Sequence, residues 1–568
     1  MFRLLLDSSN PWTLFGEAKR KELDVAMIDF PKHNERDAEK YRKHRWWLGL
    51  TLGDLVDRAA DVFPKREAVV DDKVRVTYAA LRDRVDRLAT GLMRLGIEKG
   101  DAVLLQLPNW AEYVYSYFAL QKIGAIPVVL ISGYKQLEVG HLGLLTEATA
   151  WIVPEVYRKM DYTTFIDEVK KKNPQLEHVI SVRASKDGAP FTASLEKLMD
   201  RTLRTADREA LAARRPEPGA VAHIIPSGGT TGLPKGIPRT HDDYICNVEY
   251  MHKGWEMNTS DRALIVVPVG HNLAVLNVVG SVFFGFKLIL LDSTRPEDIC
   301  ATIKAEKVTY MPMVPSLIKR ILESEQFSEY DLSSLREVLG GGEPSTPELV
   351  REVYKKIGCT YINEFGMTEG LVCRTALDDD VEVICNTVGR STCPYNDVKI
   401  LDAHGKELAR NMDGELVVKG PAIFAGYVKN PEENRKSFTN HGYFKTGDMA
   451  RIDDQGNLKI TGRIKDLIIR GGENVSPAQV EELVGTHPDV ADVAVIGVPD
   501  KDLGERVCAY VRPVAGQTLN EKELQAFMES KGASKLLIPE KFFFVDTLPM
   551  TEAGKHDKKA LREDAKRR

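Results

Sequence analysis

Short apolar runs alternate with amphipathic helical segments along the first half of the chain. Residues 102–107, 126–131 and 150–153 have the composition of buried strands. Between residue 77 and Gly96, leucines and valines recur at helical spacing, and Thr77 is suited to cap the start of that helix. Strands that alternate with helices form mostly parallel sheets covered on both faces. The chain is therefore predicted to be an α/β protein with parallel βαβ layers.

The pattern changes towards the C-terminus. Between residues 402 and 462, short strand-like runs are separated by turn dipeptides such as Asp413-Gly414, which predicts a small β region. After Arg463, Ser476-Pro477 marks the start of a helix. We expect a small α+β module there, with strands at 490–498, 507–511 and 542–545 and a helix at 521–530.

The length of the chain calls for more than one domain. At 568 residues it exceeds what a single hydrophobic core usually holds. We place the boundary where the turn-rich region ends, which predicts a large N-terminal domain of residues 1–464 and a small C-terminal domain of residues 465–568.

Charge and cysteine content exclude several classes of protein. The 78 Lys and Arg nearly balance 83 Asp and Glu, so we expect no nucleic-acid binding by bulk basicity. The seven cysteines form no CxxC pair, which favours a reduced, cytoplasmic setting. The N-terminus turns polar too early for a signal peptide, and the most apolar stretch, 278–291, is short and contains Lys287. We therefore expect no membrane span.

A loop rich in glycine and hydroxyl residues spans residues 227–236, with the sequence Ser-Gly-Gly-Thr-Thr-Gly-Leu-Pro-Lys-Gly. Glycines let backbone N–H groups approach an anion closely, while the hydroxyls and Lys235 add donors and a positive charge. The pattern is typical of a phosphate cradle, although alone it is about as common in surface loops. It is not a Walker A motif, because Pro234 precedes the lysine and Gly236 replaces the metal-binding Ser or Thr.

Further motifs follow this loop. They are Phe365-Gly366-Met367-Thr368-Glu369, Tyr443-Phe444-Lys445-Thr446-Gly447-Asp448, Gly462-Arg463-Ile464-Lys465-Asp466 and Pro549-Met550-Thr551-Glu552-Ala553-Gly554-Lys555. In this order, the motifs make the chain resemble the ANL superfamily of adenylate-forming enzymes, which contains acyl-CoA synthetases, adenylation domains of peptide synthetases and luciferases. The resemblance covers nearly the whole chain from about residue 50 onward.

The resemblance implies a reaction that suits these residue types. A carboxylate is a poor acyl donor, and its conversion to an acyl-AMP supplies a good leaving group. Attack of the carboxylate on the α-phosphate of ATP gathers negative charge on phosphate oxygens, so the reaction needs fixed cations and N–H donors. The expected cofactors are ATP, Mg²⁺ and CoA.

By resemblance, separate motifs bind separate parts of ATP. Thr368 and Glu369 would bind the α-phosphate and Mg²⁺, a hard ion that prefers oxygen ligands such as the Glu369 carboxylate. Asp448, helped by Arg463, would bind the ribose. The predicted contacts with the β- and γ-phosphates are Ser227, Gly228, Gly229, Thr230, Thr231, Gly232 and Lys235, and the segments expected near adenine contain Gly341, Gly342, Glu343, Asn363, Phe365 and Gly366.

The C-terminal domain is expected to move during catalysis. Lys555 matches the lysine that, in the family, bridges the reacting carboxylate and the α-phosphate. Lys465 occupies the family's hinge position, about which the small domain rotates between adenylation and acyl transfer. In the second state Gly471 and Gly472 would line a channel for pantetheine. The resemblance thus implies that Lys555, Glu369, Thr368 and Lys465 are catalytic.

Within the superfamily, the nearest resemblance is to aryl-acid AMP ligases, the branch that includes 2,3-dihydroxybenzoate–AMP ligase. It rests on residues 237–244, 365–372 and 466–474, and on His271-Asn272, whose asparagine hydrogen-bonds the ring 2-hydroxyl in that branch. The chain departs from the branch at Leu273, Leu276 and Asn277, which replace an aromatic residue and a pair of serines, and at Cys373, which replaces an asparagine.

These departures suggest a more apolar acid-binding pocket. An apolar pocket cannot satisfy the hydroxyls of a substituted ring. We therefore expect an unsubstituted or lightly substituted cyclic acid, aromatic or alicyclic. The residues predicted to bind it are His271, Asn272, Asn277, Met367, Leu371, Val372 and Cys373.

The predicted function is the ATP-dependent, AMP-forming activation of such an acid and its transfer to CoA. CoA is favoured because Lys235-Gly236 is similar to CoA ligases and no docking patch is evident. The alternative is a 2,3-dihydroxybenzoate or salicylate ligase that loads an aryl carrier protein, and a luciferase-like oxidation is a remote third. A non-catalytic nucleotide-binding protein would lack residues such as Lys555, which is present. We expect a monomer or a homodimer.

Overall fold

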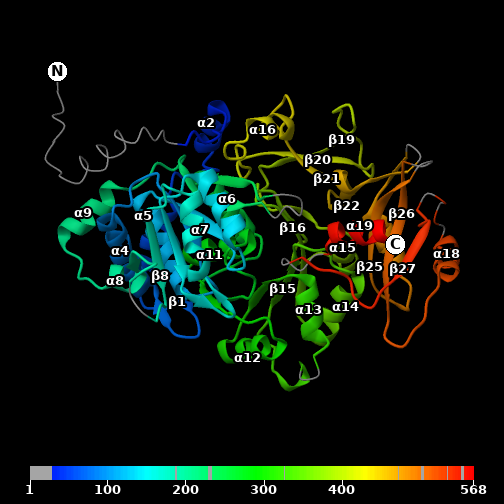
Figure 1. The fold of residues 1–568 in the computed structure, drawn as a ribbon, viewed down its shortest axis with the longest axis horizontal. Coiled ribbons are helices and arrows are strands. Elements are labelled where there is room, and N and C mark those ends of the chain that lie inside the picture. The colour runs from blue at the N-terminus through cyan, green and yellow to red at the C-terminus, as the bar shows by residue number, and fades with distance from the viewer. Residues whose placement is uncertain are drawn as a thin grey trace.

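The computed structural model describes residues 28–568 except 186–187, 228–232, 325–326, 471–472, 501–503, 532, 534, 536 and 552–555. The described part of the chain forms two large sheets, a small antiparallel sheet and a C-terminal α+β unit. Figure 1 shows the large sheets in the blue-to-green part of the molecule and the C-terminal unit, orange to red, at one end. The predicted α/β class with parallel layers is confirmed.

The first large sheet has the strand order β11-β10-β4-β3-β5-β8-β9. Its centre is parallel, as predicted. The helix predicted after Thr77 is α4 (Tyr78–Leu95), which Thr77 caps and Gly96 ends in the left-handed conformation at φ 105°. The strands of this sheet are β3 (Ala102–Gln106), β4 (Ile126–Leu130), β5 (Ala150–Pro154), β8 (His178–Val182), β9 (Ala193–Ser194), β10 (Val221–Pro226) and β11 (Gly236–Thr240).

The second large sheet has the order β18-β17-β16-β15-β14-β12-β13-β1-β2. The neighbouring strands in the run β16-β15-β14-β12-β13-β1 pair in parallel. At the edges, β2, β17 and β18 are added antiparallel. The strands are β1 (Glu67–Val70), β2 (Arg75–Thr77), β12 (Arg262–Ile265), β13 (Lys287–Leu290), β14 (Tyr310–Met313), β15 (Glu337–Gly341), β16 (Thr360–Gly366), β17 (Val372–Arg374) and β18 (Arg390–Ser391).

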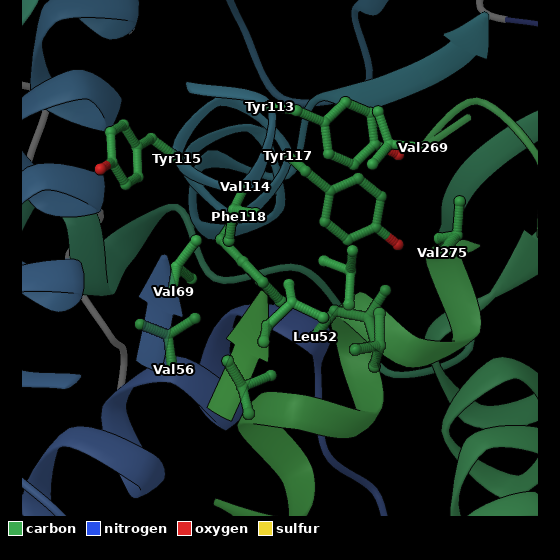
Figure 2. Close-up of a cluster of buried hydrophobic side chains, with 14 of the residues drawn as sticks. Leu52, Val56, Val69, Tyr113, Val114, Tyr115, Tyr117, Phe118, Val269 and Val275 are labelled. Carbon is green, nitrogen blue, oxygen red and sulfur yellow. The ribbon is translucent and has the colours of Figure 1, made fainter. Parts of the chain in front are cut away.

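The two large sheets share one buried core. Val103 and Leu105 of β3 belong to the same cluster as Leu339 of β15 and Ile362 of β16, and helices fill the space between the sheets. Figure 2 shows part of this core, where side chains of α5, such as Tyr117, lie near those of the neighbouring helices. The helices that contribute to it are α3 (Leu52–Val62), α4, α5 (Ala111–Ile123), α10 (His241–Lys253) and α11 (Asn272–Phe284).

Other helices cover the outer faces. The first sheet packs on α6 (Gln136–Thr146) and α7 (Thr163–Lys172). The second packs on α12 (Pro296–Glu306), α13 (Pro315–Leu322), α14 (Pro347–Lys356) and α15 (Val381–Asn386). The remaining short elements before residue 400 are α2 (Glu35–Lys43), β6 (Val156–Tyr157), β7 (Met160–Asp161), α8 (Leu195–Met199), α9 (Thr205–Ala213) and η1 (Phe327–Glu329).

The turn-rich region forms the small antiparallel sheet, with the order β19-β20-β21-β22. The C-terminal unit follows it, with β25 and β26 at its centre. The elements of this half are β19 (Asp397–Leu401), β20 (Gly414–Lys419), α16 (Pro431–Ser437), β21 (Phe444–Ile452), β22 (Leu458–Arg463), η2 (Ile464–Asp466), β23 (Ile468–Arg470), β24 (Glu473–Val475), α17 (Pro477–Gly485), β25 (Val490–Asp500), β26 (Gly504–Pro513), α18 (Glu521–Ser530), β27 (Lys541–Phe544) and α19 (Lys558–Arg567).

The small sheet and the C-terminal unit meet at Ser476. This serine was predicted as the N-cap of α17, and α17 does begin at Pro477, but the Ser476 side chain makes no capping bond. Its hydroxyl instead donates to the carbonyl oxygen of Thr461 on β22 across 2.6 Å. The predicted boundary between residues 464 and 465 falls in η2, between β22 and the C-terminal unit that this hydrogen bond joins.

Two further features are the state of the cysteines and the hydropathy of the helices. All seven cysteines lie in the described part of the chain and are free and buried. Among the described helices, none combines the length and the hydropathy needed to cross a bilayer.

Candidate active site

The described part of the phosphate loop lies at the open end of a hairpin. β10 and β11 pair antiparallel, with Pro226 opposite Gly236. Beyond this pair, the Ser227 N–H donates to the Lys235 carbonyl oxygen across 2.8 Å, and the Lys235 N–H donates to Ser227 Oγ across 3.0 Å. These bonds close the base of the loop. Its other predicted contacts, Gly228, Gly229, Thr230, Thr231 and Gly232, lie outside the described residues.

Lys235 carries its positive charge between an aromatic ring and a carboxylate. Its Nζ lies 2.5 Å from Oε1 of Glu433 on α16 and 4.3 Å from the centroid of the Tyr427 ring. Both side chains of the ion pair are 36% exposed. Partly exposed ion pairs of this kind contribute little free energy, so little stability would be lost if another anion replaced Glu433 at the Lys235 ammonium.

Glu369 follows β16 and faces the same tyrosine. The Tyr427 hydroxyl donates to Glu369 Oε1 across 2.9 Å. Burial raises the pKa of Glu369, against the opposing effects of Tyr427, Lys235 and Arg239. A nearby cation therefore stabilises the ionised form, and carboxylate oxygens are ligands that Mg²⁺ prefers. Glu369 thus fits the predicted metal role.

Arg239 holds the segment that carries Thr368 and Glu369. It is fully buried on β11, and its guanidinium donates to the carbonyl oxygens of Thr368, across 2.8 Å, and Ala422, across 2.7 Å. Its Nε pairs with Asp243 across 2.6 Å. Arg239 has no role in the sequence-based prediction. The signal that points to it is an arginine in a buried strand, four residues before an aspartate.

The N-terminal segment supports the same web of contacts. Burial opposes ionisation of Asp243, but Arg239 and His33 outweigh it and hold its pKa at about 2. His33 Nε2 lies 3.1 Å from the Asp243 carboxylate. Trp47 is buried, and its Nε1 donates to the carbonyl oxygen of Pro421 across 2.8 Å, next to the residue that Arg239 holds. His33 and Trp47 thus stabilise the contacts that Arg239 makes with Asp243 and with the segment that contains Pro421 and Ala422.

The two predicted ribose contacts lie opposite each other on neighbouring strands. Asp448 of β21 pairs with Arg463 of β22. The Arg463 Nε donates to Asp448 Oδ1 across 3.0 Å, and the Asp448 N–H donates to Thr446 Oγ1 across 3.0 Å. Asp448 is buried, whereas the Arg463 side chain is about half exposed. The geometry fixes a carboxylate as a hydrogen-bond acceptor, which is what two ribose hydroxyls require.

The segments predicted to lie near adenine are at the carboxyl ends of two adjacent parallel strands. Gly341 on β15 lies opposite Glu364 on β16, next to Phe365 and Gly366, and Gly342 and Glu343 follow β15. Glu343 Oε2 accepts from the backbone N–H of Ser316 across 3.2 Å. Carboxyl ends of parallel strands meet at one edge of a sheet, where α/β proteins bind their ligands.

Asn363 is already engaged within the protein. Its Nδ2 donates to the carbonyl oxygens of Ile384 and Thr387, and its Oδ1 accepts from Ser345. These bonds fix α15 against β16. The Asn363 side chain therefore positions this edge of the sheet rather than offering free groups to adenine.

Two of the predicted acid-binding residues begin α11. His271 immediately precedes the helix and Asn272 is its first residue. The Tyr244 hydroxyl donates to Asn272 Oδ1 across 3.0 Å. This bond orients the amide so that Nδ2 remains as the donor for a substrate. Asn277, one and a half turns further on, is fully buried, and its Nδ2 donates to the Leu273 carbonyl oxygen.

The other predicted acid-binding residues divide between two cores. Val372 packs into the core that contains α10 and α11. Leu371, Cys373 and Met367 pack instead with the small antiparallel sheet. Successive residues of a strand point to opposite faces, so β17 presents Val372 and Arg374 to the helices. The structure thus packs Val372 with the core of α10 and α11 and turns Cys373 towards the small antiparallel sheet.

The C-terminal predicted residues are described only in part. Lys465 lies in η2, whereas Gly471, Gly472 and Lys555 lie outside the described residues. Among the described residues on either side of the gap, Met550 and His556 form an antiparallel bridge. His556 Nε2 lies 3.1 Å from the Asp492 carboxylate on β25, which attaches His556 to the C-terminal sheet.

Comparison with known families gives a direct match. Residues 56–428 match the model of the AMP-binding enzyme family, and residues 479–555 match the model of the AMP-binding enzyme C-terminal domain. The chain belongs to the AMP-binding enzyme family. The predicted superfamily is therefore confirmed, and with it the prediction that the chain is an adenylate-forming ligase.

Similar members of the AMP-binding enzyme family act on aryl acids. The chain is 36% identical to the 2,3-dihydroxybenzoate-AMP ligase of Bacillus subtilis, over 93% of the chain and 96% of the relative. It is 35% identical to the salicyl-AMP ligase / salicyl-S-ArCP synthetase of Mycobacterium tuberculosis, over 96% of each. It is 34% identical to a salicylyl-CoA synthase / salicylate adenylyltransferase of a Streptomyces species, over 94% of the chain and 97% of the relative.

Proposed function

We propose that this AMP-binding enzyme activates an aryl carboxylic acid with ATP and transfers the acyl group to a pantetheine thiol. In the first step a carboxylate oxygen attacks the α-phosphorus, the bond to the β-phosphate breaks, and pyrophosphate leaves. In the second step the thiolate sulfur attacks the acyl carbon, and AMP leaves as the thioester forms. The arrangement of Glu369, Tyr427 and Lys235 beside the phosphate loop carries this proposal.

The residues of the chain have distinct proposed roles in adenylation. Lys235 and the loop that begins at Ser227 hold the departing pyrophosphate, and Asp448 with Arg463 orients the ribose. Arg239 positions Thr368 and Glu369 through the Thr368 carbonyl oxygen. Mg²⁺, held by Glu369, supplies charge neutralisation at the phosphates. Lys555 bridges the carboxylate and the α-phosphate in this step.

The second step uses a different arrangement of the C-terminal domain. We place the domain boundary at residues 464/465, with the hinge at Lys465 in η2. Rotation there withdraws Lys555 and brings Gly471 and Gly472 to the acyl-adenylate. The hydrogen bond between Ser476 and Thr461 breaks in such a rotation, because it joins the two sides of the hinge.

The acceptor thiol is proposed to be that of CoA, and the alternative is an aryl carrier protein. The names of similar relatives include both kinds of acceptor, with salicyl-S-ArCP synthetase on one side and salicylyl-CoA synthase on the other. Both acceptors present the same phosphopantetheine thiol, so the two readings share the chemistry and differ in the surface that docks.

Acid-dependent exchange of labelled pyrophosphate into ATP tests the proposal. Benzoate, salicylate, 2,3-dihydroxybenzoate and cyclohexanecarboxylate are compared, and then CoA or a phosphopantetheinylated aryl carrier protein is added. We expect exchange with an aryl acid and a thioester with one acceptor. No exchange with any carboxylic acid contradicts the function. If a thioester forms on the carrier protein and not on CoA, the acceptor is the carrier protein.

A further inference from the structure

Two buried cysteines from distant parts of the chain lie in contact beneath the N-terminal segment. Cys246 belongs to α10, and Cys393 follows β18, 147 residues further along the chain. Their sulfur atoms are 4.0 Å apart, and both residues are at most 1% exposed. This is the one sulfur–sulfur contact among the seven cysteines, all of which lie in the described part of the chain. We call these two residues the thiol pair.

The two thiols differ in how readily they lose a proton. The hydrogen bond from the Cys246 thiol lowers the pKa of Cys393, and the backbone N–H groups of Tyr395 and Asn396 act in the same direction against burial. The same contact, together with burial, raises the pKa of Cys246 well above its ordinary value. A thiolate rather than a thiol is the nucleophile. Cys393 is therefore the sulfur that attacks an oxidant, and Cys246 remains as the thiol that closes a bond to it.

The cover over the thiol pair consists of aromatic side chains. Tyr41 and Trp47 of the N-terminal segment are buried with the pair in one cluster, and Trp46 packs against that cluster. Trp46 stacks on Tyr395, with ring centroids 4.2 Å apart, and Tyr395 is 39% exposed. Solvent thus lies one aromatic layer away from the pair, and a small neutral peroxide can reach the sulfurs when this layer opens.

Cys246 is connected to the proposed metal-binding segment through its neighbour on α10. The Asn247 Nδ2 donates to the carbonyl oxygen of Gly370 across 3.0 Å, and this hydrogen bond is buried. Gly370 directly follows Glu369, the proposed Mg²⁺ ligand. A shift of α10 at Cys246 is therefore transmitted to the backbone beside Glu369 by a single hydrogen bond.

Cys393 adjoins the same segment from the other side. It packs in one cluster with Ala422. The Ala422 carbonyl oxygen accepts from Arg239 and lies so close to Gly370 that a Cβ would not fit there. A bond between the two sulfurs would move them from contact distance to covalent distance and draw α10 towards the segment after β18. Because protein interiors are close-packed, this movement displaces the backbone of Ala422 and Gly370.

We propose that Cys246 and Cys393 are a redox-sensitive thiol pair, which a peroxide converts into a disulfide, and that this disulfide slows adenylation by displacing the segment that carries Glu369. The effect on adenylation rests on the proposed function, whereas formation of the disulfide does not depend on it.

The oxidation proceeds in two balanced steps. The Cys393 thiolate attacks one peroxide oxygen, the O–O bond breaks, and the released hydroxide takes up a proton to form water, which leaves Cys393 as a sulfenic acid. The Cys246 sulfur then attacks the Cys393 sulfur, the S–O bond breaks, and water leaves with the Cys246 proton. Two thiols are oxidised to one disulfide, and one hydrogen peroxide is reduced to two waters. A thiol reductant reverses the change by exchange.

Mass spectrometry of the full-length protein tests formation of the bond. The reduced protein is treated with hydrogen peroxide, quenched with catalase and alkylated with iodoacetamide in denaturant. We expect the oxidised protein to take up two fewer alkyl groups than the seven of the reduced protein. A proteolytic digest should contain one pair of peptides linked through Cys246 and Cys393, and dithiothreitol should restore all seven alkylation sites.

Pyrophosphate exchange tests the effect on adenylation. We expect oxidation to lower the acid-dependent exchange rate about tenfold or more, since small displacements of catalytic groups cost that much, and dithiothreitol to restore the rate. Cys246→Ala and Cys393→Ala cannot form the disulfide and should keep their exchange rate under peroxide. The matched control is Cys300→Ala, at a buried thiol of α12 in a different core; it should lose activity on oxidation as the wild type does.

The outcomes separate this inference from the proposed function. A wild-type digest that lacks the link between Cys246 and Cys393 after oxidation overturns the inference, whether or not the variants fold. A disulfide that leaves exchange unchanged also overturns it, as does an equal loss of exchange in Cys393→Ala. Exchange that is absent with every acid in the reduced enzyme contradicts the proposed function, while the mass measurement still shows whether the pair closes.

Discussion

Tyr427 hydrogen-bonds Glu369 through its hydroxyl and lies under the Lys235 ammonium with its ring. The Tyr427 side chain therefore contacts both the Glu369 carboxylate and the Lys235 ammonium. In the proposed adenylation reaction the first is negatively charged and the second positively charged. The hydroxyl and the ring can be separated by mutation, because phenylalanine keeps the ring alone.

Tyr427→Phe should move the acid limb of the pH–rate profile to higher pH. Glu369 acts in its ionised form, and the hydrogen bond from Tyr427 lowers its pKa against the effect of burial. Loss of that bond raises the pKa, so protonation inactivates the enzyme at a higher pH. Pyrophosphate exchange measured between pH 5 and 8 checks this. Tyr443→Phe, which removes an exposed hydroxyl bonded to Asp397, is the control. An unshifted acid limb contradicts the role of Tyr427.

Arg239→Lys should lower the free energy of unfolding by about 3–5 kcal/mol. A lysine cannot reach both the Thr368 and Ala422 carbonyl oxygens, and it leaves Asp243 short of a buried partner. Urea unfolding followed by tryptophan fluorescence measures the loss. Arg215→Lys, at a partly exposed pair with Asp54, should cost less than about 1 kcal/mol. Equal losses in the two variants would remove the special role of Arg239.

Asp492→Asn should lower Tm more at pH 6 than at pH 9. The partner Asp492 raises the pKa of His556 above its ordinary 6.5, so this stabilisation is complete below pH 6.5 and is lost as pH rises through the raised value. Burial opposes ionisation of Asp492, but His556 outweighs it and lowers the pKa below 3.8, so the pair weakens again in acid. Thermal unfolding at the two pH values measures the difference. An equal change in Tm at both argues against the ion pair.

Lys555→Ala should abolish acyl-AMP formation while largely sparing thioester formation from synthetic acyl-AMP. The first half-reaction needs the lysine between the carboxylate and the α-phosphate, and the second proceeds with the C-terminal domain rotated. The two half-reactions are assayed separately by pyrophosphate exchange and by thioester release. Lys558→Ala, at a neighbouring lysine paired with Glu481, is the control. Equal loss in both half-reactions would remove the account based on domain rotation.

Asn272→Ala should weaken the use of a 2-hydroxybenzoate by roughly 1–3 kcal/mol in kcat/KM and that of benzoate by less. The Tyr244 hydroxyl occupies Asn272 Oδ1, so Nδ2 is left to donate to a substrate hydroxyl. Comparison of salicylate with benzoate in the exchange assay measures this. Tyr244→Phe frees the amide to rotate and should give a smaller loss in the same direction. Identical losses for the two acids would mean that Asn272 does not contact the ring substituent.

Local patterns predicted the elements well, because they depend on signals within a few residues. The strands at 102–107 and 126–131 and the helix that ends at Gly96 occur where apolar spacing and capping placed them. Ser476 shows the limit of such signals. The helix after it starts as predicted, but the Ser476 hydroxyl donates to the Thr461 carbonyl oxygen, and no local pattern encodes a contact between β22 and the C-terminal unit.

The candidate site divides in the same way. Glu369 and Lys235 belong to motifs that are read from adjacent residues, whereas their partners Tyr427 and Glu433 lie 58 and 198 residues away from them. Arg239 is absent from the predicted site residues, because its partners Thr368 and Ala422 lie far along the chain. The local signal that could have found it is an arginine in a buried strand four residues before Asp243.

The contact between Trp47 and Pro421 bears on how this protein should be prepared. The family match begins at residue 56, so an expression fragment trimmed to that start would keep every motif of the AMP-binding enzyme family. It would also discard Trp47 and His33, which hold Pro421 and Asp243 from outside the matched region. Such a fragment would carry a complete set of catalytic residues on an unsupported loop.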